Sequence, residues 1–174
     1  EVNRAVLEGA AADGRLPHFR GVYGGSDYTQ PPVITWSVWQ NYLWSGDRES
    51  LARDYAVLKD YNEWLYKSRR HQSGLFVWIH PYESGIDNSP RFGSADESRV
   101  VDMADLAAVD LNSYVALQDR VLARMASELG HMDEEEKYLA RAMEQKNLIN
   151  RKLWDPETGF YYDRDMNTDK LVKI

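Results

Sequence analysis

The sequence has 174 residues, 43% of them hydrophobic and 28% charged, a balance typical of a soluble globular domain and too polar for a membrane protein. Its 21 Lys and Arg against 28 Asp and Glu give a net charge of −7, and because no basic block occurs we expect no nucleic-acid partner. No stretch approaches the roughly 18 apolar residues of a membrane span, so we expect no membrane partner. The absence of cysteine excludes disulfides and thiolate metal sites, and it fits a cytoplasmic or a periplasmic, bacterial-like protein equally well.

The first half of the sequence predicts a helical hairpin. Pro31 and Pro32 open a segment whose apolar residues recur at helical spacing, and Gly46 ends it. Asp47 is a suitable N-cap for a second helix, which ends in the basic stretch 67–70 that favours a helix C-terminus. The predicted turn therefore consists of a Gly that stops one helix and an Asp that starts the next.

A second hairpin is predicted in the other half. Its first helix runs from about Asp102 to Leu129 and is closed by Gly130. Acidic residues 133–136 mark the positive end of the helix that follows. Because helices dominate, the predicted fold class is all-α, and the apolar run at 171–174 has no predicted helix or strand to receive it.

The long connection between the hairpins, roughly residues 72–99, holds the strongest candidate site, because long ordered loops in compact domains are usually functional. Two carboxylates, Glu83 and Asp87, lie close to Arg91 and to large aromatic residues. Such a segment can aim several polar side chains at one point, as a polyol substrate requires. Cleavage of a glycosidic bond needs one carboxylic acid to protonate the leaving oxygen. The alternative, which stays open, is that Glu83 and Asp87 cap the loop and pair with Arg91.

No cofactor or metal site is expected. The sequence has no Gly-rich phosphate loop, no His-Glu-x-x-His motif and no Gly-x-Ser-x-Gly motif. Its four histidines are too scattered for a metal site. His131 lies in a predicted turn and is expected to face solvent, whereas His80 is either a hydrogen-bonding loop residue or part of the site.

Several segments resemble glycoside hydrolase family 63, which includes processing α-glucosidase I and bacterial enzymes that act on glucosides, mannosylglycerate or glucosylglycerate. Residues 83–91 read ESGIDNSPR and resemble the signature segment of the family. Residues 28–36, YTQPPVITW, resemble the start of one of its helices, and residues 102–112, DMADLAAVDLN, resemble the helix after its acid loop. Residues 153–163, LWDPETGFYYD, are similar to a segment shared more widely by toroid glycosidases, so they support the fold more than the family.

The resemblance implies an (α/α)6 toroid, in which helical hairpins surround a central pocket, with residues 1–174 as the early, incomplete part of the catalytic domain. It implies an inverting α-glycoside hydrolase that releases glucose or a related hexose from an α-glucoside, an oligosaccharide or a glycosylglycerate. Asp87 matches the general acid. Tyr82 stands where the family often has Trp. The residues implied to contact the carbohydrate substrate are Gln30, Trp36, Tyr82, Glu83, Gly85, Asn88 and Arg91.

The second catalytic carboxyl is expected outside this sequence. An inverting pair stands roughly 6.5–9.5 Å apart with a water between its members, and the resemblance places the base, a Glu, farther along the toroid. Asp110 and Glu157 are interpreted instead as a helix-face residue and a turn residue. We therefore expect residues 1–174 to be inactive alone and to need the remainder of the domain, from the same chain or another. Alternatives from other classes are a non-catalytic carbohydrate-binding or helical interaction module and a helical repeat scaffold.

Overall fold

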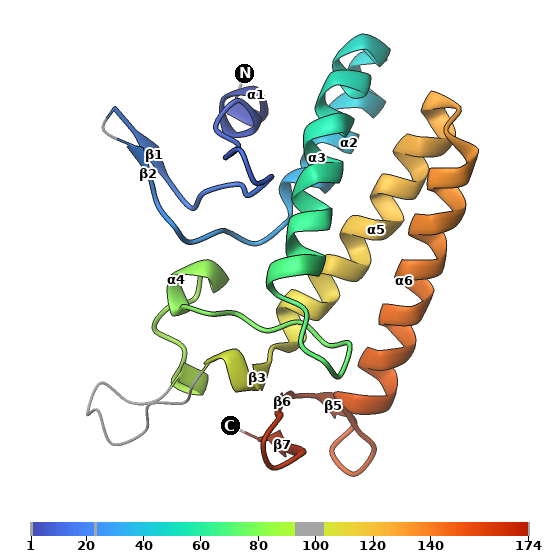
Figure 1. Ribbon diagram of the computed structural model, residues 1–174. Helices are drawn as coiled ribbons and strands as arrows, with labels where there is room; N and C mark the ends of the chain where they lie inside the picture. The colour runs from blue at the N-terminus through green and yellow to red at the C-terminus, as the bar shows by residue number, and fades with distance from the viewer. Residues whose placement is uncertain (1, 23, 93–102, 174) are drawn as a thin grey trace.

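Two helical hairpins form the body of the molecule, and most of the short strands gather at one end of it (Figure 1). The computed structural model describes residues 2–22, 24–92 and 103–173. No helix among them is long and apolar enough to cross a membrane. The elements in chain order are α1 Val2–Leu7, β1 Arg20–Gly21, β2 Gly24–Gly25, α2 Ile34–Ser45, α3 Arg48–Ser68, α4 Pro81–Ser84, η1 Pro90–Phe92, η2 Met103–Asp105, β3 Leu106–Ala107, α5 Val109–Leu129, α6 Met132–Lys152, β4 Trp154–Asp155, β5 Phe160–Tyr161, β6 Asp163–Asp165 and β7 Lys170–Val172.

Helices α2 and α3 meet at the turn that the sequence predicts. Gly46 follows α2 in the left-handed conformation, with a φ of 67° that favours glycine, and its N–H donates to the carbonyl of Tyr42. The Asp47 carboxylate accepts from the backbone N–H of Ser50 at 3.0 Å and so caps α3. Helix α2 begins at Ile34, later than the predicted opening, because residues 31–33 first form a turn.

The prediction that a helix begins near Asp102 is wrong. Asp102 itself lies outside the described residues, and α5 begins only at Val109. Strand β3 precedes it, pairs with β6 and has both side chains buried, as in a strand covered on two faces. The N–H of Val109 donates to Asp163 Oδ1 at 2.8 Å. The start of α5 is therefore set by a residue that lies more than a whole helical hairpin later in the chain.

The fold is mostly helical but contains small sheets, which corrects the predicted all-α class. Strands β3, β6 and β7 form an antiparallel sheet in the order β3-β6-β7, β4 pairs with β5, and β1 pairs with β2. The apolar run near residue 171 does have a partner: Leu171 and Val172 lie in β7 and pair with β6. The prediction that nothing receives this run was wrong because the receiving strand, Asp163–Asp165, is polar and carries no apolar alternation.

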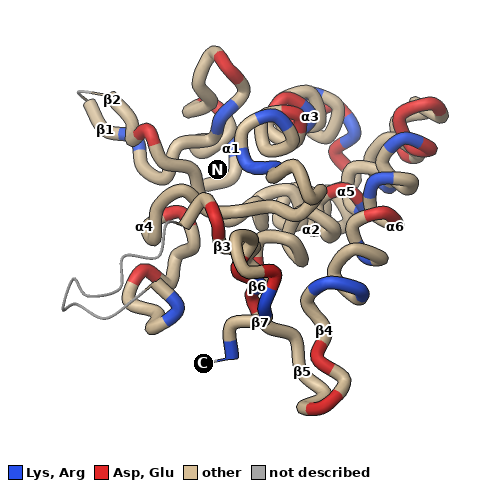
Figure 2. Tube along the Cα trace, turned by 60° about the horizontal axis from the view of Figure 1, so that its bottom comes forward, with Lys and Arg blue, Asp and Glu red and all other residues tan. Residues whose placement is uncertain are grey.

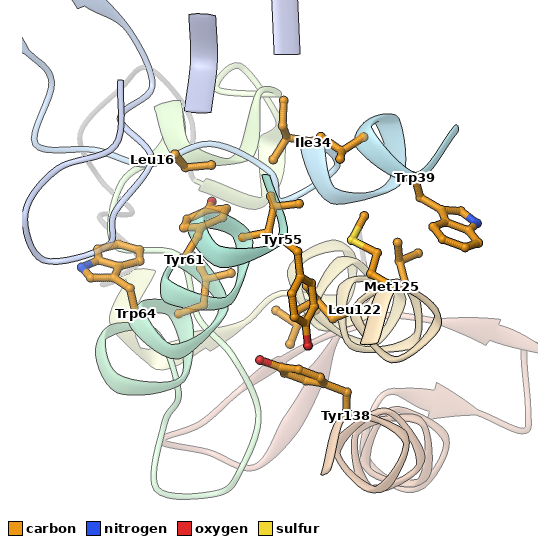
Figure 3. Packing of buried hydrophobic residues seen from close by; sticks show 14 of the residues in the cluster. Leu16, Ile34, Trp39, Tyr55, Tyr61, Trp64, Leu122, Met125 and Tyr138 are labelled. Carbon is orange, nitrogen blue, oxygen red and sulfur yellow. The ribbon is translucent and has the colours of Figure 1, made fainter. Parts of the chain in front are cut away.

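One large apolar cluster joins the two hairpins to the loop between them. Phe76 and Trp78 of that loop are fully buried in the cluster, and burial of a large apolar side chain contributes about 1.5–3 kcal/mol. The loop between the hairpins is thus anchored in the core by its apolar side chains. Of the members labelled in Figure 3, Leu16 lies in the segment between α1 and β1, and the others come from α2, α3, α5 and α6 and include Trp39, Tyr55, Tyr61, Leu122, Met125 and Tyr138.

A buried polar network ties α3 to α5. The Asp119 carboxylate is buried and accepts from Asn62 Nδ2 at 2.9 Å and from the Tyr66 hydroxyl at 2.8 Å. Burial raises the pKa of Asp119 to about 6, and these two hydrogen bonds offset part of that effect. The neighbouring Gln118 donates to Thr35 Oγ1 of α2 at 3.2 Å. Because unpaired polar groups are costly inside a protein, this network fixes how the three helices pack.

Charged residues of both signs are interspersed along the helices (Figure 2). Arg141 and Lys137 of α6 each reach Glu63 of α3 at 2.7 Å, and Lys59 reaches Glu134 at 2.5 Å. Exposed ion pairs of this kind contribute at most about 1 kcal/mol each. The hairpins are therefore held together chiefly by the apolar cluster and the buried network.

Candidate active site

The loop at residues 80–91, called the acid loop after the predicted role of Asp87, lies at the end of the helices where β3 and β6 also lie (Figure 1). It opens with α4, whose first turn is capped by His80 Nδ1 accepting from the Tyr82 N–H at 3.2 Å. Gly85 ends α4 at a φ of 71°, a left-handed conformation that suits glycine. Asp87 follows in an exposed turn, and its carboxylate makes no hydrogen bond or ion pair with another described residue. The loop thus presents Asp87 to solvent.

Glu83 anchors the acid loop from inside the protein. Its side chain is fully buried, and its two oxygens accept from Arg69 Nη2 and Nε at 2.5 and 3.0 Å. They also accept from the backbone N–H groups of Thr29 and Ile79 at 3.1 and 3.2 Å. Through these four contacts the Glu83 side chain joins the acid loop to the end of α3, and its predicted contact with substrate stays a prediction.

Arg91 anchors the other end of the loop. Its side chain is buried, and its guanidinium donates to Asp110 Oδ2 at 2.5 Å and to Asp163 Oδ2 at 3.4 Å. Arg91 therefore pairs with neither Glu83 nor Asp87, so the alternative of a local capping cluster is wrong. The predicted contact of Arg91 with substrate stays a prediction. Asp110, interpreted from sequence as a helix-face residue, lies in the first turn of α5 and also accepts from Trp78 Nε1 at 3.2 Å.

Aromatic rings surround the start of the acid loop. Tyr28 stacks on His80 with ring centroids 4.0 Å apart, and Tyr82 lies 4.6 Å from His80 and edge-on to Tyr28. Tyr82 remains 53% exposed. His80 thus serves as a hydrogen-bonding loop residue and as a packing surface for both tyrosines. A half-exposed ring supported from behind in this way offers a flat apolar face to a ligand.

A family model described as the mannosylglycerate hydrolase MGH1-like glycoside hydrolase domain matches residues 1–174. The chain belongs to this family. The resemblance to glycoside hydrolase family 63 is confirmed, because a mannosylglycerate hydrolase of that family from Thermus thermophilus, solved in complex with glucose, is similar at a TM-score of 0.76 and 25% identity. That likeness covers 97% of this chain and 55% of the solved chain.

Two curated relatives of this glycoside hydrolase domain are also named mannosylglycerate hydrolases. A mannosylglycerate hydrolase from a second strain of Thermus thermophilus is 36% identical over an alignment of 107 positions that covers 47% of this chain and 26% of that protein. One from Rubrobacter radiotolerans is 26% identical over an alignment of 180 positions that covers 74% of this chain and 40% of that protein. A family 78 rhamnosidase from Bacillus sp. GL1, at 17% identity and a TM-score of 0.64, shows a shared fold alone. The chain thus spans well under two thirds of the length of these relatives.

Within the glycoside hydrolase domain, Glu83 brings two of the predicted site segments together. Its contact with the Thr29 N–H holds the chain just before Gln30, whose carbonyl accepts from the buried Tyr61 hydroxyl at 2.6 Å. Pro31 lies 3.8 Å from the point where a side chain at Gly85 would begin. The predicted site residues near this junction are Gln30, Tyr82, Gly85, Asp87 and Asn88. Trp36, which lies after Pro31 and Pro32 in the first turn of α2, is half exposed.

Sequence reasoning missed the residues that hold the acid loop of this domain. In the sequence, Arg69 stands only in a basic stretch that favours a helix end, and Asp163 stands only in a segment that supports the fold. Burial raises the pKa of Asp163, and the charge of Arg91 lowers it in part. No local pattern distinguishes these residues, since their partners lie 14 and 72 positions away in the chain.

Among the described residues, no cluster of His, Asp or Glu could hold a metal ion.

Proposed function

We propose that the protein carrying this domain is an inverting α-glycoside hydrolase with Asp87 as its general acid. The observation that carries the proposal is the contrast along the acid loop. Glu83 and Arg91, four residues before and after Asp87, are both buried in ion pairs, whereas Asp87 is exposed and without a partner among the described residues. A fixed loop with one unengaged carboxyl is the arrangement that general acid catalysis needs.

The chemistry requires a carboxyl on each side of the sugar. Asp87 gives its proton to the glycosidic oxygen as the bond from C1 to that oxygen breaks, and a water attacks C1 from the opposite face. A second carboxylate takes the proton of that water. We propose that this base is a Glu outside residues 1–174, supplied by the remainder of the domain.

The substrate class follows from the relatives. Proteins named mannosylglycerate hydrolase match this chain, and the Thermus structure has been solved with glucose and with Tris and D-glycerate. An α-hexosylglycerate is therefore the first substrate to test, with α-glucosides and α-linked oligosaccharides as alternatives. The exposed Tyr82 ring and the polar Gln30 and Asn88 side chains suit a hexose, which has an apolar ring face and a polar rim.

The proposed toroid also accounts for apolar surface on the hairpins. A groove of about 520 Å³ between α5 and α6 is lined in part by Leu117, Leu139 and Met143, which are 39%, 50% and 57% exposed. Helix α2 exposes Leu43 and Trp44. Contiguous exposed apolar surface usually marks a contact with another element. We propose that helices of the remaining domain cover these faces, and that residues 1–174 are the early part of that domain.

The configuration of the first sugar released tests the proposed function. Proton NMR of the complete gene product acting on α-mannosylglycerate should show the β-anomer of the hexose before mutarotation, because inversion exchanges the two faces of C1. Release of the α-anomer would contradict the inverting mechanism. If neither α-mannosylglycerate nor an α-glucoside is cleaved while sugar binding persists, the non-catalytic binding module is the correct interpretation.

Tyr82 is expected to act through its ring face. Tyr82→Ala should lower kcat/KM about 10-fold, because loss of a stacking ring removes on the order of 1–2 kcal/mol of interaction. Tyr82→Phe keeps the face and should stay within about threefold of the wild type. Steady-state kinetics of both variants in the complete protein make the comparison, and equal losses would assign the contribution to the hydroxyl group instead.

A further inference from the structure

Asp110 and Asp163 each use their two carboxylate oxygens for different purposes. In both residues Oδ2 accepts from the Arg91 guanidinium, at 2.5 Å for Asp110 and 3.4 Å for Asp163. In both, Oδ1 accepts from the backbone at the start of α5, from the Leu111 N–H at 2.7 Å and from the Val109 N–H at 2.8 Å respectively. The two carboxylates therefore connect Arg91 directly to the first turn of α5.

This connection is buried and holds the guanidinium from two sides. The side chains of Arg91, Asp110 and Asp163 are 8%, 19% and 7% exposed. Separate nitrogens, Nη2 and Nη1, contact the two aspartates, so both terminal amino groups of the guanidinium are held, while Nε has no hydrogen-bond partner among the described residues. Charge-assisted hydrogen bonds are stronger than neutral ones, and water competes little for groups this buried. Arg91 is therefore a fixed point four residues after Asp87.

We propose that Asp110 and Asp163 are positioning residues that hold the general acid in place through Arg91. The inference rests on the proposed role of Asp87. Proton transfer to a leaving group requires accurate placement, and a shift of about 1 Å can reduce the rate about 100-fold. Asp163 is the more informative of the two because it lies on β6, outside the loop and outside the helix that the loop contacts.

The leaving group of the substrate distinguishes positioning of the acid from general weakening of the fold. A glycosylglycerate releases a basic alkoxide oxygen that needs the proton of Asp87, whereas a glycosyl fluoride releases fluoride, a weak base that needs little protonation. In the complete protein, Asp163→Asn should lower kcat/KM on α-mannosylglycerate about 10- to 100-fold. On α-mannosyl fluoride it should change kcat/KM less than about threefold.

Asp165→Asn is the matched control. Asp165 lies on the same strand, and its carboxylate accepts from the N–H groups of Asn167 and Thr168 in the turn to β7, without contact with Arg91. This variant makes the same change of charge on the same strand and should leave the ratio of the two activities unchanged. Asp110→Asn is a second test and should shift the ratio in the same direction as Asp163→Asn.

The possible outcomes separate the two proposals. Equal losses on both substrates, or no loss on either, would overturn the positioning role of Asp163. If neither Asp163→Asn nor Asp110→Asn folds, the two aspartates are structural and the inference fails. Asp87→Asn is measured beside them: if it shows no loss that depends on the leaving group, the proposed acid is wrong. If only the Asp87 variant shows that dependence, the acid stands and the positioning role alone is lost.

Discussion

Asp87→Asn in the complete protein is expected to lower kcat on an α-hexosylglycerate by about 10²–10⁴, the usual contribution of a general acid. The amide has nearly the shape of the carboxyl but has no acidic proton to give to the leaving oxygen. Asp87 is exposed and has no partner among the described residues. Its replacement should therefore change the free energy of unfolding by less than about 0.5 kcal/mol. Turnover assays and chemical denaturation measure the two effects.

A matched control separates loss of the acid from loss of a negative charge. Asp27 is an exposed aspartate outside the acid loop, with a side chain that is 100% exposed and 3.5 Å from Arg15. Asp27→Asn makes the same change of charge and should leave kcat unchanged. Turnover of the Asp87→Asn variant within a few-fold of the wild type would remove Asp87 from the mechanism.

Glu83→Gln is expected to destabilise the complete protein by about 3–5 kcal/mol, because it leaves Arg69 buried without a counter-charge. The two residues are 0% and 5% exposed. A glutamine can still accept from some of the N–H groups that Glu83 now holds, so the effect reports chiefly the buried charge. Urea unfolding monitored by tryptophan fluorescence gives the difference in free energy. Activity should fall as well, because the same residue holds the segment before Gln30 against the acid loop.

The neighbouring ion pair supplies the control for this variant. Arg70 Nη2 lies 2.6 Å from the Glu144 carboxylate, at almost the same distance as the buried pair, but the two side chains are 30% and 56% exposed. Glu144→Gln should therefore cost at most about 1 kcal/mol. Similar values for Glu83→Gln and Glu144→Gln would show that burial of the Glu83 and Arg69 pair contributes little.

The parts of the fold that could be predicted are those with local signals. Gly46 and Asp47 mark the turn of one hairpin, and Gly130, with a φ of 85°, marks that of the other. The start of α5 could not be predicted, because the preceding residues pair with β6, a strand that lies beyond α6 in the chain. Helical spacing alone predicts a helix through the residues of β3, since buried strands and helices are both apolar.

In the candidate site, too, some features could be predicted from a local motif and others depend on distant residues. The motif at 83–91 predicts Asp87 as the acid, and the exposure of Asp87 supports that proposal. Glu83 and Arg91 belong to the same motif but face the protein interior. A polar residue in a loop can point either way, and only partners far along the chain decide which. Here those partners are Arg69 for Glu83 and Asp163 for Arg91.

The leaving-group dependence of Asp87→Asn in the complete protein tests most directly whether Asp87 is the proton donor. We expect kcat/KM on α-mannosylglycerate to fall by at least about 100-fold, while kcat/KM on α-mannosyl fluoride stays within about 10-fold of the wild type. An equal loss on both substrates, or no loss on either, would contradict Asp87 as the general acid.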